Sequence, residues 1–405
     1  MTTITALDVG SHEMRAVVSK LLPEEEIQII GVAKVPSRGV KKGVIIDIHE
    51  ASQAITQVLK EAESISGTHL PHVVTGINGV NLQSIATKGI IAVSRADREI
   101  SENDIERALK AAQNASLAPN REILEIISRD FVIDNEEGIK NPVGMSGIRL
   151  EVNTVIITAY AAFLRNLLKA VELGGWKVAR HVPGPLASAQ AVISHRQRDL
   201  GVVVCDIGSD TTGVAIYEEG ELLHLEVLPV GAGLITSDIA IGLRIDIDTA
   251  ETIKVKYGTM LANQVRKSEM IELDSLGFGE DLRIRRQEVA EIIEARMREM
   301  LSLISKILEK TGKKNFLPAG VVLVGGGAKL EGLVPLAKDI LHLPVRIGYP
   351  EQFRGLVDQV TDPLFAKACG LILCYARDIK STSRKEHYAS KAGVSFQTLL
   401  RRLLP

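Results

Sequence analysis

Cysteine is scarce in this sequence. Only three of its 405 residues are cysteines, Cys205, Cys369 and Cys374, and each lies in an apolar run without the spacing of metal ligands. We therefore expect buried structural thiols, which suit a reducing compartment.

Long apolar runs and an excess of charge of one sign are also absent. No apolar stretch approaches the roughly 18 residues that cross a bilayer, and the N-terminus has no basic flank before an apolar segment. The sequence therefore predicts neither export nor a transmembrane helix. With 48 basic and 50 acidic side chains the formal charge is −2, so no global field favours a membrane, and no nucleic acid partner is expected.

The length and apolar content are those of a soluble globular protein with more than one domain. At 405 residues, 45% of them apolar, the chain is too long for one ordinary core, so we expect domains around a cleft.

The same sequence pattern occurs twice in the chain. A strand that ends in Asp8 is followed by a turn at Gly10 and a second strand, and the pattern recurs 198 residues later at Asp206 and Gly208. This repeat predicts a duplicated fold.

Alternating strand and helix patterns place the chain in the α/β class. Residues 152–182 read as strand, helix, a Gly174-Gly175 stop and strand, and residues 285–312 read as a long amphipathic helix that precedes a strand. Between about residues 81 and 159 the pattern changes to a small α+β insertion, whose helix opens on a Ser101…Asp104 capping signature. We expect mixed sheets covered by helices.

Two Asp-x-Gly-Ser turns and a third glycine-rich turn after a strand indicate a phosphate-binding site. One such turn alone is common for turn geometry, but glycine also lets backbone N–H groups approach phosphate oxygens, and hydroxyls add donors. Asp8 and Asp206 would face each other across the cleft and hold a hydrated Mg²⁺. The candidate phosphate-binding residues are Gly10, Ser11, His12, Gly208, Ser209, Asp210, Thr211 and Thr212.

A second group of candidates would hold the adenosine of a nucleotide. The third glycine-rich turn would let the backbone approach the adenine or ribose closely. Glu251 and Lys254 lie three apart on one helix face, where they either hold the ribose and flank the base or form an ordinary surface ion pair. The candidates are Gly231, Gly233, Glu251, Lys254, Gly325, Gly326, Gly327 and Lys329.

The motifs together resemble the actin superfamily. LDVGS, VVCDIGSDTTGVAIY and VVLVGGGAKLEGL are similar to its three nucleotide motifs, and PGPLASAQAVI and DPLFAKACGLIL to its two connecting helices. The insertion, with NPVGMSGIRLEV at its exit, and the stretch VGAGLITSDIAIGLRIDIDTAETIKVKYG resemble FtsA-type cell-division proteins. The resemblance implies actin-like, duplicated ribonuclease-H-like domains around an ATP and Mg²⁺ site. It implies a first domain at 1–80 and 160–195, an FtsA-type insertion at 81–159, and a second domain at 196–376 with a small subdomain at about 235–315.

The sequence departs from the superfamily pattern beside the cleft. Many relatives carry Glu, Gln or Asn before the second proline of the first connecting helix, where it orients the attacking water, but here Pro183 and Gly184 precede Pro185. We therefore expect ATP binding with hydrolysis slowed by about 10²–10⁴-fold. Glu13 follows the first phosphate loop, where some relatives have a cation, and its carboxylate should turn away from the phosphates.

The last residues differ in composition from the rest. From Arg377 onward seven Lys and Arg face two acidic residues. We expect a flexible linker at 377–393 and an amphipathic helix at 394–405 with an apolar arc of about 140°. Such a helix is typical of a membrane interface, with docking on its own protein as the alternative. The predicted membrane-binding residues are Phe396, Leu399, Leu400, Arg401, Arg402, Leu403 and Leu404.

The resemblance implies a function and partners. FtsA-like proteins polymerise on the cytoplasmic face of the cell membrane at the division site, bind anionic lipid and other division proteins, and tether the tubulin-like protein FtsZ by its acidic C-terminal peptide. Candidates for that peptide are Arg285, Arg286, Arg296 and Arg298, unless Glu288, Glu291, Glu294 and Glu299 merely balance them on a solvated helix face. The alternatives are a soluble small-molecule kinase of the same superfamily or another actin-like cytoskeletal or pilus-assembly protein.

Overall fold

The computed structural model describes residues 2–23, 26–114, 119–272 and 283–392, with side chains as far as residue 380. The predicted membrane-binding residues between Phe396 and Leu404 therefore lie outside the described part of the chain. Within that part no helix combines the length and the apolar character that a bilayer crossing requires.

The first half is built on a sheet of six described strands in the order β11-β6-β1-β2-β3-β19. The predicted repeat supplies its centre, because the apolar strand that ends after Asp8 pairs antiparallel with the strand that follows the turn. Strands β6 and β11 join in parallel on one side. The strands are β1 (Thr2–Val9), β2 (Glu13–Leu21), β3 (Ile27–Pro36), β6 (His72–Ile77), β11 (Lys177–Pro183) and β19 (Arg354–Gly355).

The second half repeats this order. Its strands run β18-β17-β12-β13-β14, with β12 antiparallel to β13 and parallel to β17, so the sequence repeat corresponds to a repeated topology. This confirms the predicted duplication. The strands are β12 (Val202–Ile207), β13 (Thr212–Glu218), β14 (Glu221–Leu228), β17 (Val321–Val324) and β18 (Val345–Ile347).

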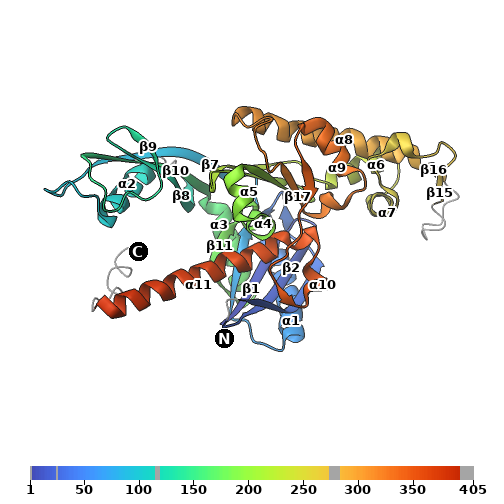
Figure 1. Ribbon diagram of the computed structural model, residues 1–405. Coiled ribbons are helices and arrows are strands. Elements are labelled where there is room, and N and C mark those ends of the chain that lie inside the picture. The colour runs from blue at the N-terminus through green and yellow to red at the C-terminus, as the bar shows by residue number, and fades with distance from the viewer. Residues whose placement is uncertain (1, 24–25, 115–118, 273–282, 393–405) are drawn as a thin grey trace.

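The insertion extends the second sheet. A single residue pair, Glu226 with Gln83, joins β14 to β7, after which the order continues through β10, β8 and β9. The predicted helix is present, and Ser101 and Asp104 exchange the expected capping hydrogen bonds. The elements are β7 (Gln83–Ala92), α2 (Glu102–Asn114), β8 (Arg121–Ile133), β9 (Glu136–Ile139) and β10 (Arg149–Tyr160). Figure 1 shows this module standing out from the body.

Two helices lie between the sheets and form the floor of the cleft. They are α4 (Gly184–Val192) and α11 (Ala366–Ala392), which pack against each other and against both halves. Alternation along β12 explains how: Val202 and Val204 face these helices, while Val203 and Cys205 face a second core on the outer side. Cys205, Cys369 and Cys374 are all buried and free, as expected.

The remaining helices cover the outer faces of the sheets. α1 (Ile48–Ser66) and α3 (Ala161–Leu173) cover the first half, and α6 (Gly233–Leu243), α7 (Ile247–Tyr257), α8 (Arg286–Lys310) and α9 (Leu333–Leu341) belong to the second. The shorter elements are β4 (Val40–Lys41), β5 (Val44–Ile45), α5 (His195–Leu200), β15 (Met270–Glu272), β16 (Arg283–Arg285) and α10 (Val357–Val360), with short 3₁₀ turns at Ala262–Gln264, Gly326–Lys329 and Pro363–Phe365.

One expectation about the chain's organisation is corrected. Residues 377–392 were expected to be a flexible linker, but α11 continues through them to Ala392. The segment has no proline or glycine before Gly393, and its Arg, Lys, Glu and Ala residues favour a helix, so its intrinsic helix propensity outweighs its polarity. Figure 1 shows α11 projecting beyond the body on the side of the insertion.

Candidate nucleotide-binding cleft

The two predicted phosphate loops, which follow Asp8 and Asp206, lie on the two halves and meet around the cleft. Each follows an apolar strand that ends in aspartate, and each turns back tightly on itself. At Gly10 a side chain would meet the carbonyl oxygen of Glu13 at 2.6 Å, and the backbone N–H of Gly208 donates to the carbonyl of Thr211. The glycines therefore serve the turn itself, and they leave backbone atoms exposed toward the cleft.

A loop of the first half ties the two phosphate loops together. The backbone N–H of Gly43 donates to Ser11 Oγ at 3.0 Å, and that of Lys42 donates to Asp210 Oδ2 at 2.9 Å. Ser11 and Asp210, both predicted site residues, thus lie near the same loop although they belong to different halves. The described conformation is a closed cleft on this side.

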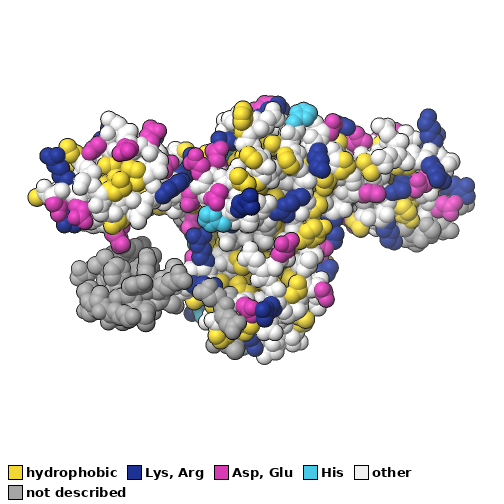
Figure 2. Space-filling view, viewed as in Figure 1, with side chains coloured by type: hydrophobic (Ala, Val, Ile, Leu, Met, Phe, Trp, Pro, Cys, Tyr) yellow, Lys and Arg dark blue, Asp and Glu magenta, His cyan; other side chains and the backbone are white. Residues whose placement is uncertain are grey.

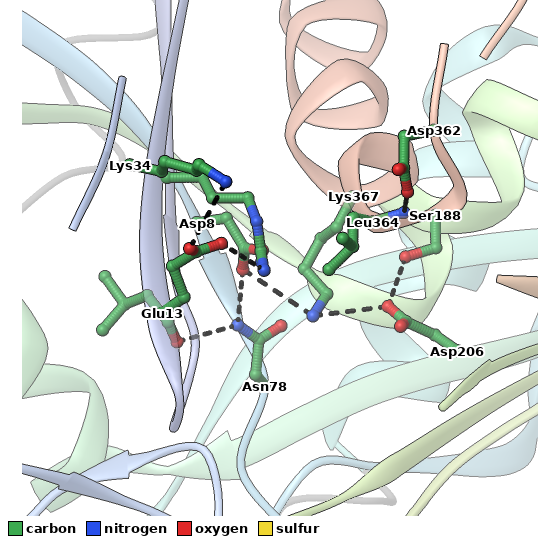
Figure 3. Close-up of polar contacts among 11 residues, drawn as sticks. Asp8, Glu13, Lys34, Asn78, Ser188, Asp206, Asp362, Leu364 and Lys367 are labelled. Atoms are coloured by element: carbon green, nitrogen blue, oxygen red, sulfur yellow. Dashed lines mark hydrogen bonds and ion pairs between the residues drawn. The ribbon is translucent and has the colours of Figure 1, made fainter. Parts of the chain in front are cut away.

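A lysine lies between the two aspartates. Lys367, in the first turn of α11, places its Nζ 3.7 Å from Asp8 Oδ1 and 3.3 Å from Asp206 Oδ2. Figure 3 shows the side chain reaching into the gap between the halves. Burial alone would lower the pKa of Lys367, but the two carboxylates outweigh it and leave the pKa raised, so the side chain is an ammonium ion at neutral pH.

Further side chains bind the same two carboxylates, and Asn78 and Ser188 contact the same oxygens as Lys367. Asn78 donates from Nδ2 to Asp8 Oδ1 at 3.2 Å, and Ser188 on α4 donates to Asp206 Oδ2 at 2.7 Å. Arg15 lies 3.6 Å from Asp8 and 2.8 Å from Glu13. Glu13 therefore turns toward Arg15, and Figure 3 shows it beside Lys34. That it turns away from bound phosphates stays a prediction.

In this conformation the ammonium group of Lys367 lies between Asp8 and Asp206, where the sequence predicts a hydrated Mg²⁺. The cavity lined by Asn78, Asp206, Gly208 and Lys367 has a volume of about 20 Å³, which holds about one water molecule. Mg²⁺ usually keeps several of its waters. Among the described residues no three His, Cys, Asp or Glu side chains form a metal-binding group either.

The predicted hydroxyl donors are not equivalent. Thr211 lines the small cavity, but Thr212 is 1% exposed and donates from Oγ1 to the carbonyl of Val230 at 2.8 Å. Its hydroxyl therefore donates to the turn before α6 in this conformation, and its role as a phosphate donor stays a prediction. The sequence pattern could not distinguish the two threonines, because both follow the same loop.

A larger cavity lies beside the second phosphate loop. It has a volume of about 380 Å³ and is lined by His12, Ser209, Asp210, Gly233, Glu251 and neighbouring residues of α6 and α7. Burial acts to raise the pKa of Glu251, but hydrogen bonds from Lys254 and Thr236 outweigh it and lower the pKa. Glu251 is therefore an anionic acceptor on the cavity wall.

Lys254 does not line this cavity. Its ammonium group is 2.6 Å from Glu251 and 2.8 Å from the hydroxyl of Thr236, and its side chain is only 9% exposed. Lys254 and Glu251 therefore form the predicted ion pair at helical spacing, but the lysine is buried and the pair does not lie on the surface. Lys254 acts on the cavity by fixing Glu251.

The remaining glycines serve close packing between turns. A side chain on Gly231 would meet the carbonyl oxygen of Ser209 at 2.3 Å, and one on Gly325 (φ +84°) would meet Asp206 Oδ1 at 2.6 Å. Gly327 lies equally close to Ile207, and Gly326 has more room. Lys329 pairs with Asp362 at 2.5 Å and lines a different cavity, of about 430 Å³.

The four arginines of the helix region all have carboxylate partners. Arg296 binds Asp238 of α6 through two hydrogen bonds, and Arg286 binds Glu269 at 2.7 Å. Arg298 and the more exposed Arg285 pair within their own helix region, with Glu294 and Glu288. Figure 2 shows acidic and basic side chains intermingled at this end of the molecule. The arginines and glutamates therefore neutralise one another as the alternative prediction had it, although the side chains of Arg285 and Arg298 remain about half exposed or more.

Among the side chains that contact Asp8 or Asp206, Arg15, Asn78, Ser188 and Lys367 were not among the predicted residues. One signal was present for Lys367, since it is the single charged residue in the apolar run that opens α11. Asn78 and Ser188 gave no signal, because an amide after a strand and a serine in a small-residue helix are ordinary.

Comparison with known proteins identifies the family. A family model described as "Cell division protein FtsA" matches residues 203–370, and one described as "SHS2 domain inserted in FTSA" matches residues 79–158. The chain is 36% identical to the cell division protein FtsA of Pseudomonas aeruginosa over 370 residues, covering 91% of this chain and 88% of the relative. It is 34% identical to that of Escherichia coli K12 over 91% of this chain and 89% of the relative.

Solved structures agree on the fold. The PilM–PilN type IV pilus biogenesis complex aligns with a TM-score of 0.66 at 19% identity, covering 91% of this chain and 97% of that one. MreB5 of Spiroplasma citri bound to ADP aligns with a TM-score of 0.56 at 14% identity, covering 94% and 99%. At such identities the likeness concerns the fold alone. With its actin-like architecture and its inserted SHS2 domain, the chain belongs to the FtsA family of cell-division proteins.

Proposed function

We propose that this chain binds ATP in the cleft and polymerises on the cytoplasmic face of the cell membrane at the division site. Its C-terminal residues bind the membrane, and the chain thereby tethers FtsZ to that membrane. The observation that carries the nucleotide part is the convergence of the two phosphate loops beside a 380 Å³ cavity with an anionic wall at Glu251. MreB5 of Spiroplasma citri bound to ADP has the same fold.

In this proposal the nucleotide bridges the two halves. The phosphates contact the loops at Gly10 to His12 and Gly208 to Thr211, and the ribose hydroxyls donate to Glu251. Mg²⁺ bound with the ATP would neutralise part of the phosphate charge, and Lys367 already lies between Asp8 and Asp206, the two carboxylates predicted to hold the hydrated metal.

Turnover should be slow. Gly184 stands at the position where relatives carry a water-orienting residue. A larger residue there would displace the side chain of Asn78, since a Cβ would lie 2.0 Å from Asn78 Oδ1. A missing water-orienting group slows hydrolysis by about 10²–10⁴-fold. ATP then acts as an assembly ligand rather than as fuel for rapid cycling.

The membrane part rests on the basic, amphipathic tail and on family membership. One short interfacial helix binds weakly, whereas many copies linked in a polymer bind with high avidity. FtsZ and other division proteins are the proposed partners, and Arg285 and Arg298 are the more exposed cations for an acidic peptide.

Co-sedimentation with vesicles that contain anionic lipid tests the proposal. The full chain is compared with a chain truncated after Gly393, with and without ATP and Mg²⁺. Leu400→Asp places a charge on the apolar arc, and Thr398→Asp places the same charge on the opposite face as a matched control.

We expect the full chain and Thr398→Asp to pellet with vesicles, more strongly with ATP, and the truncated chain and Leu400→Asp to remain in the supernatant. Equal pelleting of the full and truncated chains would show that the anchor lies elsewhere. A full chain that stays in solution in every condition would contradict membrane tethering.

A further inference from the structure

We propose that the ammonium group of Lys367 takes the place of a divalent cation between the two phosphate loops, so that this chain binds ATP nearly as well without Mg²⁺ as with it. The inference rests on the proposed ATP binding. It concerns one side chain that belongs to neither of the phosphate loops nor to the adenosine side of the cleft.

The position of Lys367 is that of a bridging cation. Its Nζ lies within 4 Å of one carboxylate from each half, 3.7 Å from Asp8 and 3.3 Å from Asp206, and so it links the two loops. In Figure 3 the side chain extends from α11 to a point between Asp8 and Asp206. A hydrated metal held by the same two carboxylates would have to occupy the same gap.

A lysine at this position is otherwise unfavourable. It lies in the first turn of α11, where the helix dipole disfavours a positive charge, and its neighbours Ala368, Cys369 and Leu371 are fully buried. Burying an ammonium ion is costly unless it is paired. The two aspartates supply that pairing, and in return the lysine relieves the repulsion between them across the cleft.

The space around the ammonium group also favours this assignment. The cavity of about 20 Å³ beside Lys367 and Asn78 holds one water but not a hydrated metal ion. Asn78 Oδ1 is buried and has no hydrogen-bond partner. A single water between Asn78 Oδ1 and the Lys367 ammonium would satisfy both groups.

The test is a binding titration of the full chain with a fluorescent ATP analogue, in Mg²⁺ and in EDTA. Lys367→Met keeps the aliphatic stem and removes the charge, and Lys367→Arg keeps the charge. Lys338→Met, at an exposed position of α9, is the matched control. Thermal melting of each variant confirms that it is folded.

We expect the dissociation constants of the unaltered chain, Lys338→Met and Lys367→Arg to change by less than about threefold on removal of Mg²⁺. For Lys367→Met we expect binding in EDTA to weaken by about tenfold or more, the size of one charge-assisted contact. Equal Mg²⁺ dependence of the unaltered chain and Lys367→Met would overturn the inference while leaving ATP binding intact. Absence of binding in both conditions for every variant would instead overturn the proposed ATP site, and the inference with it.

Discussion

At the scale of single residues, Asn78 and Gly184 determine each other. Asn78 donates to Asp8 Oδ1 and to the carbonyl of Val9, both at 3.2 Å, and its Oδ1 occupies the place where a side chain of residue 184 would begin. The absence of a water-orienting residue at the start of α4 is therefore a structural property of the cleft. The amide that fills the place comes from the end of another strand.

The contact between Asn78 and Gly184 predicts how much stability the protein loses when a methyl group is added at residue 184. Gly184→Ala should lower the free energy of unfolding by about 1–3 kcal/mol, because Asn78 must rotate and lose its bonds to Asp8 and Val9. In the double variant with Asn78→Ala the clash is absent, so the two losses should be strongly non-additive. Urea denaturation of the four proteins measures the coupling, and strict additivity would contradict the described contact.

At the scale of elements, the sequence predicted strands and helices well where regularly spaced apolar residues pack into a hydrophobic core. Helices α2, α3 and α8 and the repeated strand pairs lie where the patterns indicated. The prediction of a flexible linker from residue 377 was wrong because this polar segment has a high helix propensity and continues α11. The contacts of Lys367 and Ser188 could not be predicted, since they depend on how α11 and α4 bring distant segments to one point.

The arginines of the α8 region should divide into two classes when they are replaced. Arg296→Met removes a two-bonded contact between α8 and Asp238 of α6 and should cost about 1–2 kcal/mol of stability. Arg285→Met removes a more exposed pair at 3.7 Å and should cost no more than about 0.5 kcal/mol. Thermal melting of both variants checks the order. A reversed order would show that the α6–α8 contact adds little.

At the scale of the whole molecule, the two halves share the core around α4 and α11, while the second half has a further core on its outer side. Cys369 and Cys374 lie in the shared core and Cys205 lies in the outer one. Burial raises the pKa of Cys205 to about 12 and that of Cys374 to about 11. The three thiols therefore report on both cores.

The native chain should show no fast-reacting thiol toward a disulfide reagent at pH 8. Few thiolates exist at a pH so far below the raised pKa values, and the sulfur atoms are inaccessible. The urea-unfolded chain should titrate all three cysteines. ATP should slow native labelling at every position, since a ligand that bridges the halves raises the free energy of opening. Rapid labelling of Cys205 alone would mean that the outer core opens independently.

Helix α11 spans 27 residues, from Ala366 beside the cleft residue Lys367 to Ala392. At 1.5 Å per residue the helix is about 40 Å long. Because the helix is long, a tilt of about 5° around Lys367 at its first turn would displace its far end by about 3.5 Å. Small rearrangements around a nucleotide are thereby magnified at the point from which residues 393–405 depart.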